Sequence, residues 1–180
     1  VVPFHVDIDG KATRPMYERM EFIVKKLQGF YQDTFGIKVT NAQTAVGESG
    51  RGVGAEYKNR FQVLINTGFG LPQPARGERS QMGVFIRRFV SQLPPDLRGW
   101  VDTAVYTANR PWRTLGQRGA GKVAYFRPVA GYGDGTPLEH YVQRDACLRR
   151  LPMTASASAM LEEAGPRRAQ PVRLIQQQHQ

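Results

Sequence analysis

Apolar and polar residues alternate strictly at the start of the chain, over residues 3–9. One side of this stretch carries Phe4, Val6 and Ile8. The other side carries His5, Asp7 and Asp9. Side chains two residues apart point to the same face of a β-strand, so the pattern predicts a strand with one buried and one polar face.

The pattern then changes to a helical period over residues 13–36. Its apolar positions form one stripe: Met16, Met20, Ile23, Val24, Leu27, Phe30 and Tyr31. We expect a long helix that Thr13 caps, that has Pro15 near its first turn and that ends at Gly36. A second stripe, over residues 80–93, predicts another helix with Ser80 as its cap. That stripe contains Met82, Phe85, Ile86, Phe89 and Val90.

Four further segments are predicted to be strands: 37–43, 56–66, 100–107 and 122–129. The glycine-rich segment 47–54 is expected to be a hairpin or surface loop. It lacks the Gly-Lys-Ser/Thr ending of a phosphate-binding P-loop and precedes a strand, whereas a P-loop precedes a helix. A capping-box pattern that begins at Thr136 predicts one more helix, over residues 136–148.

Strands and helices therefore alternate loosely, and several strands are neighbours in sequence. This order favours an α+β fold with a mostly antiparallel sheet flanked by helices. We expect residues 1–152 to form the core, and residues 153–180, which are small-residue-rich and then Gln-rich, to form a peripheral segment and a flexible tail. Because the chain begins directly on an apolar strand, we expect it to be a fragment of a longer protein.

Composition adds a possible partner. The 180 residues contain 25 Lys and Arg against 15 Asp and Glu, a formal net charge of +10. An arginine-rich surface suits phosphate groups and makes nucleic acid a candidate ligand. The single cysteine, Cys147, excludes an internal disulfide and a thiolate zinc cluster within this chain and favours an intracellular setting. No apolar run is long enough for a transmembrane helix, so no membrane partner is expected.

Three acidic residues are candidates for a metal site. Asp7 and Asp9 share a strand face at a spacing of about 6.5–7 Å, and Asp102 interrupts a second apolar strand, where an unpaired charge is costly. Acids at the end of a strand are common, so Asp-x-Asp alone is weak. With Asp102 on a neighbouring strand, the set predicts a two-metal site. Oxygen ligands favour Mg²⁺ or Mn²⁺ over zinc.

Basic residues accompany these acids along the chain. Lys58 and Arg60 begin the strand at 56–66, and Arg110 and Arg113 follow Asp102. Cations beside a metal site can bind a triphosphate and stabilise charge that develops on it. The combined set therefore predicts a site for a nucleoside triphosphate.

Three segments resemble motifs I, II and III of the archaeo-eukaryotic primase superfamily, in particular its PrimPol and herpesvirus-type primase branch. They are "FHVDIDG", "KNRFQVLIN" and "VDTAVYTANRPWRTLGQRGAGK". The resemblance implies a primase-polymerase (RRM-like) catalytic core. In it, Asp7, Asp9 and Asp102 hold the metals, while Lys58, Arg110 and Arg113 contact the phosphates of the nucleotide.

The resemblance also implies an activity and partners. The activity is template-directed nucleotidyl transfer that synthesises or extends primers. The ligands would be single-stranded DNA template, primer and NTP or dNTP, with a helicase or other replication proteins as further partners. The setting would be the nucleus or a mitochondrion, if the source is eukaryotic or viral.

One position departs from the family. Motif II normally carries a histidine that contacts the triphosphate, whereas this chain has Gln62, with Arg60 two residues away. Glutamine donates hydrogen bonds but does not become cationic. An alternative is therefore a degenerate primase-fold domain that binds nucleic acid or partner subunits without catalysis. A third hypothesis is a glycosyltransferase, whose Asp-x-Asp holds the metal of a nucleotide-sugar; the basic charge argues against it.

Overall fold

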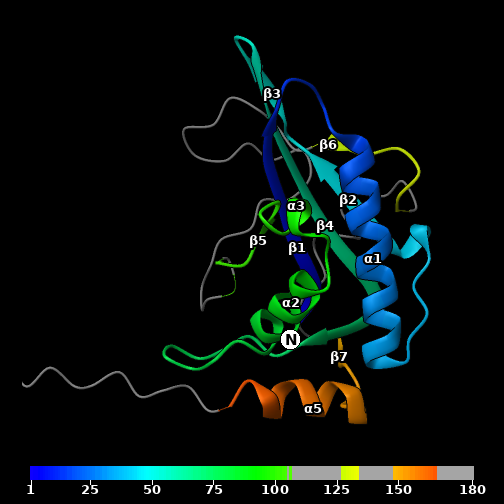
Figure 1. Cartoon of the computed structure of the whole chain (residues 1–180). Coiled ribbons are helices and arrows are strands. Elements are labelled where there is room, and N and C mark those ends of the chain that lie inside the picture. The colour runs from blue at the N-terminus through cyan, green and yellow to red at the C-terminus, as the bar shows by residue number, and fades with distance from the viewer. Residues whose placement is uncertain (105, 107–126, 134–147, 166–180) are drawn as a thin grey trace, which may run out of the picture.

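A central sheet organises the computed structural model, which describes residues 1–104, 106, 127–133 and 148–165 (Figure 1). Its strands, within these residues, are β1 (Val2–Ala12), β2 (Thr44–Glu48), β3 (Arg51–Val53), β4 (Glu56–Leu71), β5 (Val101–Asp102), β6 (Arg127–Pro128) and β7 (Arg149–Arg150). The order is β5-β1-β4-β2-β6, and β3 and β7 also pair with β4. Every pairing is antiparallel except that of β4 with β7. The predicted α+β class with a mostly antiparallel sheet flanked by helices is confirmed, and the sheet is open.

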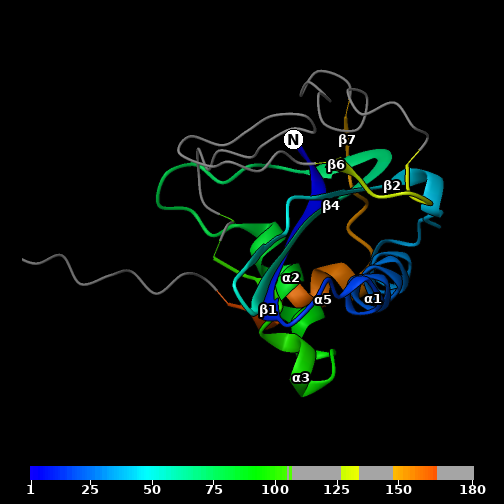
Figure 2. The same cartoon turned by 90° about the horizontal axis from the view of Figure 1, so that it is seen from above.

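The longest helices all cover one face of this sheet (Figure 2). They are α1 (Tyr17–Phe35), α2 (Gln81–Ser91) and α5 (Ala155–Glu163); a short helix α3 (Pro95–Arg98) and a 3₁₀ turn η1 (Asn41–Gln43) complete the described elements. The sheet residues that face them are the apolar ones expected from the alternation. Phe4, for example, is fully buried and makes edge-on ring contacts with Tyr31 and Phe35 of α1. The polar residues of β1 therefore lie on the opposite face of the sheet.

Two of the three residues that the sequence predicts at helix ends are confirmed. Ser80 caps α2, because its Oγ accepts a hydrogen bond from the amide of Gly83 at 3.0 Å. Gly36 ends α1 with a positive φ of 72°, as the sequence predicts. The predicted cap at Thr13 is wrong, since α1 begins only at Tyr17.

A residue of the sheet stabilises the start of α1 in place of Thr13. The buried Asn59 of β4 accepts a hydrogen bond from the amide of Met16 at 2.8 Å and donates one to the carbonyl of Arg14 at 3.2 Å. These backbone groups precede the helix and have no partner within it. A side chain more than forty residues away therefore determines where α1 begins.

Several predicted strand boundaries are wrong. No strand covers 37–43, where the structure has an irregular segment and then η1; β2 lies later, at Thr44–Glu48. β4 extends beyond the predicted 56–66, past an irregularity in its pairing with β1, to Leu71. The glycine-rich segment contains the end of β2 and all of β3, and it leads into β4 through a turn.

Three other predictions concern segments that the structure describes only in part or not at all. The strand predicted at 100–107 appears as β5, Val101–Asp102, and Thr103 and Ala104 lie beyond its end. Of the strand predicted at 122–129, Arg127–Pro128 is described and forms β6. The helix predicted at 136–148 falls almost wholly outside the described residues.

The segment after Pro152 begins as an ordered helix that packs on the others. Thr154 caps α5, because its Oγ1 accepts a hydrogen bond from the amide of Ala157 at 3.1 Å. Ala157 is fully buried, and α5 contacts both α1 and α2. The Gln-rich end, residues 166–180, lies outside the described part of the chain.

Candidate functional site

The pairing of three neighbouring strands brings two of the predicted acids together. Asp7, in β1, lies directly opposite Asp102 of β5 on one side and opposite Gln62 of β4 on the other. Directly opposed residues of antiparallel strands project from the same face, with Cβ atoms about 4.5–5.5 Å apart. Asp7 is 5% exposed and Gln62 is 2% exposed, so both side chains are buried, whereas Asp102 is half-buried.

Asp9 lies on the same face, one pleat farther along β1, and its side chain is directed to a cation. It is paired in register with Arg60, and Arg60 Nε lies 3.7 Å from Asp9 Oδ1. Both side chains are partly exposed, and ion pairs of this kind contribute at most about 1 kcal/mol. The ion pair between Asp9 and Arg60 is therefore weak, and another charged group could replace either partner.

The described residues therefore hold a pair of opposed carboxylates with a third acid nearby. Within this part of the chain, no group of three or more His, Cys, Asp or Glu side chains is arranged to hold a metal ion. Two carboxylates directly opposite each other repel, and a divalent cation between them removes that cost. Asp7 and Asp102 are therefore the two carboxylates that could hold a divalent cation, while the Asp9 carboxylate is directed to Arg60.

Basic residues continue the same face toward the β3–β4 turn. Lys58 shares the face of Gln62 and Arg60, because the three alternate along β4. It lies directly opposite Lys11 of β1 and Arg51 of β3. We call Lys11, Arg51 and Lys58 the basic rim. Along the polar face, the residues therefore change from acidic at Asp7 to basic at Lys11 and Lys58 over two pleats of β1.

Lys11 and Arg51 were missed as site residues. The first strand was expected to end at residue 9, although the alternation that groups Asp7 with Asp9 also includes Lys11. Arg51 lies among glycines that predict a loop, whereas it pairs in β3. Lys11 Nζ also lies 3.2 Å from Glu56 Oε1, and both groups are exposed.

Tyr106 closes the site beside the opposed acids. Its hydroxyl donates a hydrogen bond to the carbonyl of His5 at 2.8 Å, and the two rings lie 5.4 Å apart. Burial raises the pKa of Tyr106 well above its ordinary value, and the negative charges of Asp7 and Asp102 raise it further. The phenol therefore stays protonated and can act only as a hydrogen-bonding group at neutral pH.

His5 shares the strand face of Asp7, but its ring is engaged with the backbone. Its Nδ1 lies 2.8 Å from the carbonyl oxygen of Pro3, which fixes the orientation of the imidazole. Burial lowers the pKa of His5, and the hydrogen bond to Pro3 offsets part of that effect. His5 is thus neutral at pH 7 and adds no positive charge to the site.

Trp100 holds β5 against β1 and so positions Asp102. Its carbonyl accepts a hydrogen bond from the amide of Asp9 at 2.8 Å, and its ring packs directly over Gly10. The strand ends at Asp102, whose Oδ1 accepts a hydrogen bond from the amide of Ala104 at 2.9 Å. This local turn orients the Asp102 carboxylate at the edge of the sheet.

The remaining candidates lie outside the described residues. Arg110 and Arg113 belong to 107–126, and of the segment that resembles motif III the structure describes residues 101–104 and 106. The described candidates are thus Asp7, Asp9, Asp102, Lys58, Arg60 and Gln62, and all six belong to one strand-pairing network.

Comparison with known proteins adds no family assignment. No family model matches the chain, and no curated protein matches it either. No helix within the described residues is both long and apolar enough to cross a membrane. Function is therefore inferred from the residues themselves.

Proposed function

We propose that this chain is a metal-dependent nucleotidyltransferase of the primase-polymerase type, which adds nucleotides to a primer on a single-stranded DNA template. The observation that carries the proposal is the register of β1. It sets Asp7 opposite both Asp102 and Gln62, one pleat from the pair formed by Asp9 and Arg60. The resemblance to primase motifs I to III supports the same function.

In this proposal the opposed carboxylates Asp7 and Asp102 hold Mg²⁺ or Mn²⁺. The bound ions would activate the primer 3′-hydroxyl and neutralise charge on the phosphates. The hydroxyl oxygen would attack the α-phosphorus and lose its proton to solvent, while the bond to the pyrophosphate leaving group breaks. The protein residues place the triphosphate for this step.

The strand β4 supplies a path for that triphosphate. Gln62, Arg60 and Lys58 follow one another on one face at intervals of about 6.5–7 Å, so hydrogen-bond donors and cations extend from the acids to the basic rim. Gln62 donates from its amide where the family uses histidine, and Arg60 supplies the positive charge. If Arg60 bound phosphate instead of Asp9, the Asp9 carboxylate would be available as a third metal ligand beside Asp7 and Asp102.

A catalytically silent domain is the second candidate, and two observations favour it. Gln62 cannot carry charge, and Asp9 is already paired with Arg60. Such a domain keeps the fold and the basic surface for binding DNA. It predicts neither Mn²⁺-dependent stabilisation by a nucleotide nor nucleotide incorporation.

Asp102→Asn separates the two candidates, with Asp96→Asn, at an exposed position in α3, as the matched control. Without metal, we expect Asp102→Asn to be more stable than wild type by a few tenths of a kcal/mol, because the repulsion from Asp7 is lost. With Mn²⁺ and dNTP, we expect wild type and Asp96→Asn to gain stability and extend a primer, and Asp102→Asn to do neither. Unchanged primer extension by Asp102→Asn, or no extension by wild type, refutes the proposal.

A further inference from the structure

The glycine-rich segment forms a narrow hairpin at one end of the sheet (Figure 1). In it, β3 pairs with the start of β4 through a turn that contains Gly54, whose φ is 62°. The ring of Tyr57 lies against β3, because a Cβ added to Gly50 would lie 2.7 Å from its hydroxyl oxygen and one added to Gly52 would lie 3.8 Å from its Cδ2. The ring therefore occupies one face of the hairpin and leaves the other face to other side chains.

That other face carries the basic rim. Lys58 lies directly opposite Arg51 on one side and Lys11 on the other, so the three cations form a row across three strands. Directly opposed side chains have Cβ atoms about 4.5–5.5 Å apart, and like charges in such positions destabilise a sheet. All three residues are exposed. An anion that binds across the row would remove their mutual repulsion.

Acidic side chains compensate this row only in part. Lys11 Nζ lies 3.2 Å from Glu56 Oε1, and their side chains are 72% and 52% exposed, so the ion pair is weak. Within the described part of the chain, Arg51 and Lys58 form no ion pair with an acidic residue. The rim therefore keeps an excess of positive charge that faces solvent.

The rim lies too far from the acids to serve only the phosphates of one nucleotide. Lys11 is four residues from Asp7 along β1, and Lys58 is four residues from Gln62 along β4, about 13 Å in each case. This distance corresponds to roughly four base-pair steps of 3.4 Å in a nucleic-acid duplex. A longer chain of phosphates is therefore needed to reach from the acids to Lys11 and Arg51.

The chemistry of this face favours a duplex over a single strand. Proteins that bind single strands combine cations with aromatic side chains on which the bases stack. Within the hairpin, residues 51–58, the aromatic side chain is that of Tyr57, and it takes the opposite face. A face with cations alone contacts phosphates, which a duplex presents on its outside. A two-stranded ribbon is also narrow enough to enter the major groove, which is about 12 Å wide.

We propose that the basic rim binds the sugar-phosphate backbone of the primer–template duplex, about four base pairs from the reacting end. The identity of this duplex rests on the proposed function, whereas the contact itself rests on the cation row. Lys11 and Arg51 then neutralise phosphates of the duplex, and the hairpin lies along it. Because such contacts release counterions, the affinity for duplex depends on salt.

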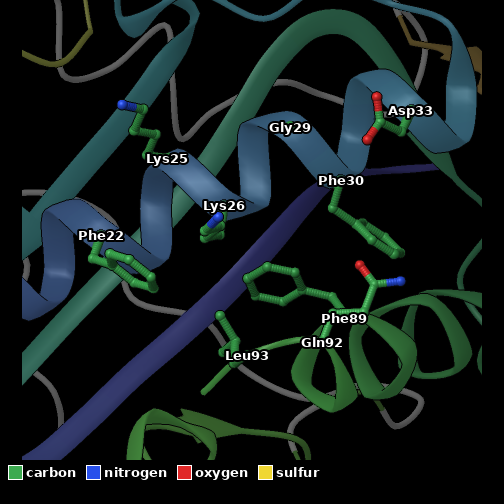
Figure 3. Close-up of a pocket in the computed structure, with 9 residues that line it drawn as sticks. All are labelled: Phe22, Lys25, Lys26, Gly29, Phe30, Asp33, Phe89, Gln92 and Leu93. Carbon is green, nitrogen blue, oxygen red and sulfur yellow. The ribbon is translucent and has the colours of Figure 1, made fainter.

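The test uses the whole chain and a fluorescently labelled DNA duplex of about 20 base pairs, without metal or nucleotide, at about 50–200 mM salt. The rim variant combines Lys11→Gln with Arg51→Gln. The matched control combines Lys25→Gln with Lys26→Gln, which removes the same charge from exposed positions of α1. Figure 3 shows that Lys25 and Lys26 belong to this helix, which covers the other face of the sheet.

By fluorescence anisotropy we expect the rim variant to bind duplex at least about tenfold more weakly than wild type at about 50 mM salt. The slope of log affinity against log salt should become shallower by about 2, one for each phosphate contact removed. The control should lose less than about twofold and keep its slope. The proposal is overturned if the control loses as much, if the rim variant binds duplex like wild type, or if it loses only the binding of oligo-dT.

Two further measurements separate this proposal from misfolding and from the proposed function. The rim variant should melt within about 3 °C of wild type, because both positions are exposed, and Lys11→Arg with Arg51→Lys should keep the wild-type affinity. Weakened duplex binding by the rim variant, with no primer extension by wild type, would refute the proposed function and leave the rim as a DNA-binding surface. Primer extension by wild type, with unchanged duplex binding by the rim variant, would refute the rim alone.

Discussion

The contact of Trp100 with Gly10 offers the sharpest test of how the sheet positions Asp102. A Cβ built on Gly10 would lie 2.5 Å from two atoms of the Trp100 ring and 2.6 Å from a third. Carbon atoms in good contact are about 3.5–4.0 Å apart, so Gly10→Ala requires a shift of about 1 Å. Backbone forms one side of the contact, and the ring must therefore move.

The expected cost follows from this overlap. Inserting one methyl group into a packed site typically costs about 1–3 kcal/mol, and we expect Gly10→Ala to lose about 2 kcal/mol of unfolding free energy. For a chain of this length that corresponds to a decrease in Tm of roughly 4–8 °C. Since the Trp100 carbonyl accepts a hydrogen bond from the Asp9 amide, the shift should also disturb β5 and the position of Asp102, the residue proposed to bind Mn²⁺.

A double-mutant cycle isolates the contact. Urea unfolding is measured for wild type, Gly10→Ala, Trp100→Leu and the double variant. Trp100→Leu alone loses packing, but it also removes the ring that the added methyl group at position 10 would meet. The double variant should therefore be more stable than the sum of the single changes by about 1–2 kcal/mol. Additive free energies would refute the reasoning that the ring is what excludes a side chain at position 10.

Two further predictions concern the polar side chains of Asn59 and His5. Asn59→Ala removes the hydrogen bonds to the Met16 amide and the Arg14 carbonyl. We expect the free energy of unfolding in urea to fall by about 2–3 kcal/mol and the first turn of α1 to fray, which hydrogen exchange detects. A loss below about 0.5 kcal/mol contradicts this role. Because the pKa of His5 is lowered in the folded state, the unfolded chain binds a proton first as pH falls, so stability contributed by His5 is lost below about pH 6.5. Between pH 7 and about 5.5 we therefore expect His5→Gln to have a flatter stability profile than wild type, and an unchanged slope would exclude the effect.

Local pattern was sufficient wherever a side chain's neighbours are close in sequence. The alternation of Phe4, Val6 and Ile8 identified β1 and its buried face, and Gly36 and Ser80 marked ends of helices correctly. The same alternation grouped Asp7 with Asp9. These inferences hold because period and capping depend on the backbone of a single element.

Predictions from the local pattern were wrong where residues distant in sequence bury a segment. Ile37 and Val39 look like a strand but pack against the core from an irregular segment. The true strand β2 begins at Thr44 and contains Gly47, a residue of low strand propensity that is buried because β4 and β6 flank it. The start of α1 was likewise displaced by the distant Asn59.

By itself, then, the sequence determined β1, the helices α1 and α2, the α+β class and the polar face with Asp7 and Asp9. Only the tertiary structure decided which strands are neighbours: it set Asp102 and Gln62 on either side of Asp7, turned Asp9 to Arg60, and brought Lys11 and Arg51 together with Lys58. The reason is physical. The periodicity of a strand specifies which face a side chain takes, whereas register between strands depends on packing against α1, on Trp100 over Gly10 and on hydrogen bonds between residues far apart in the chain.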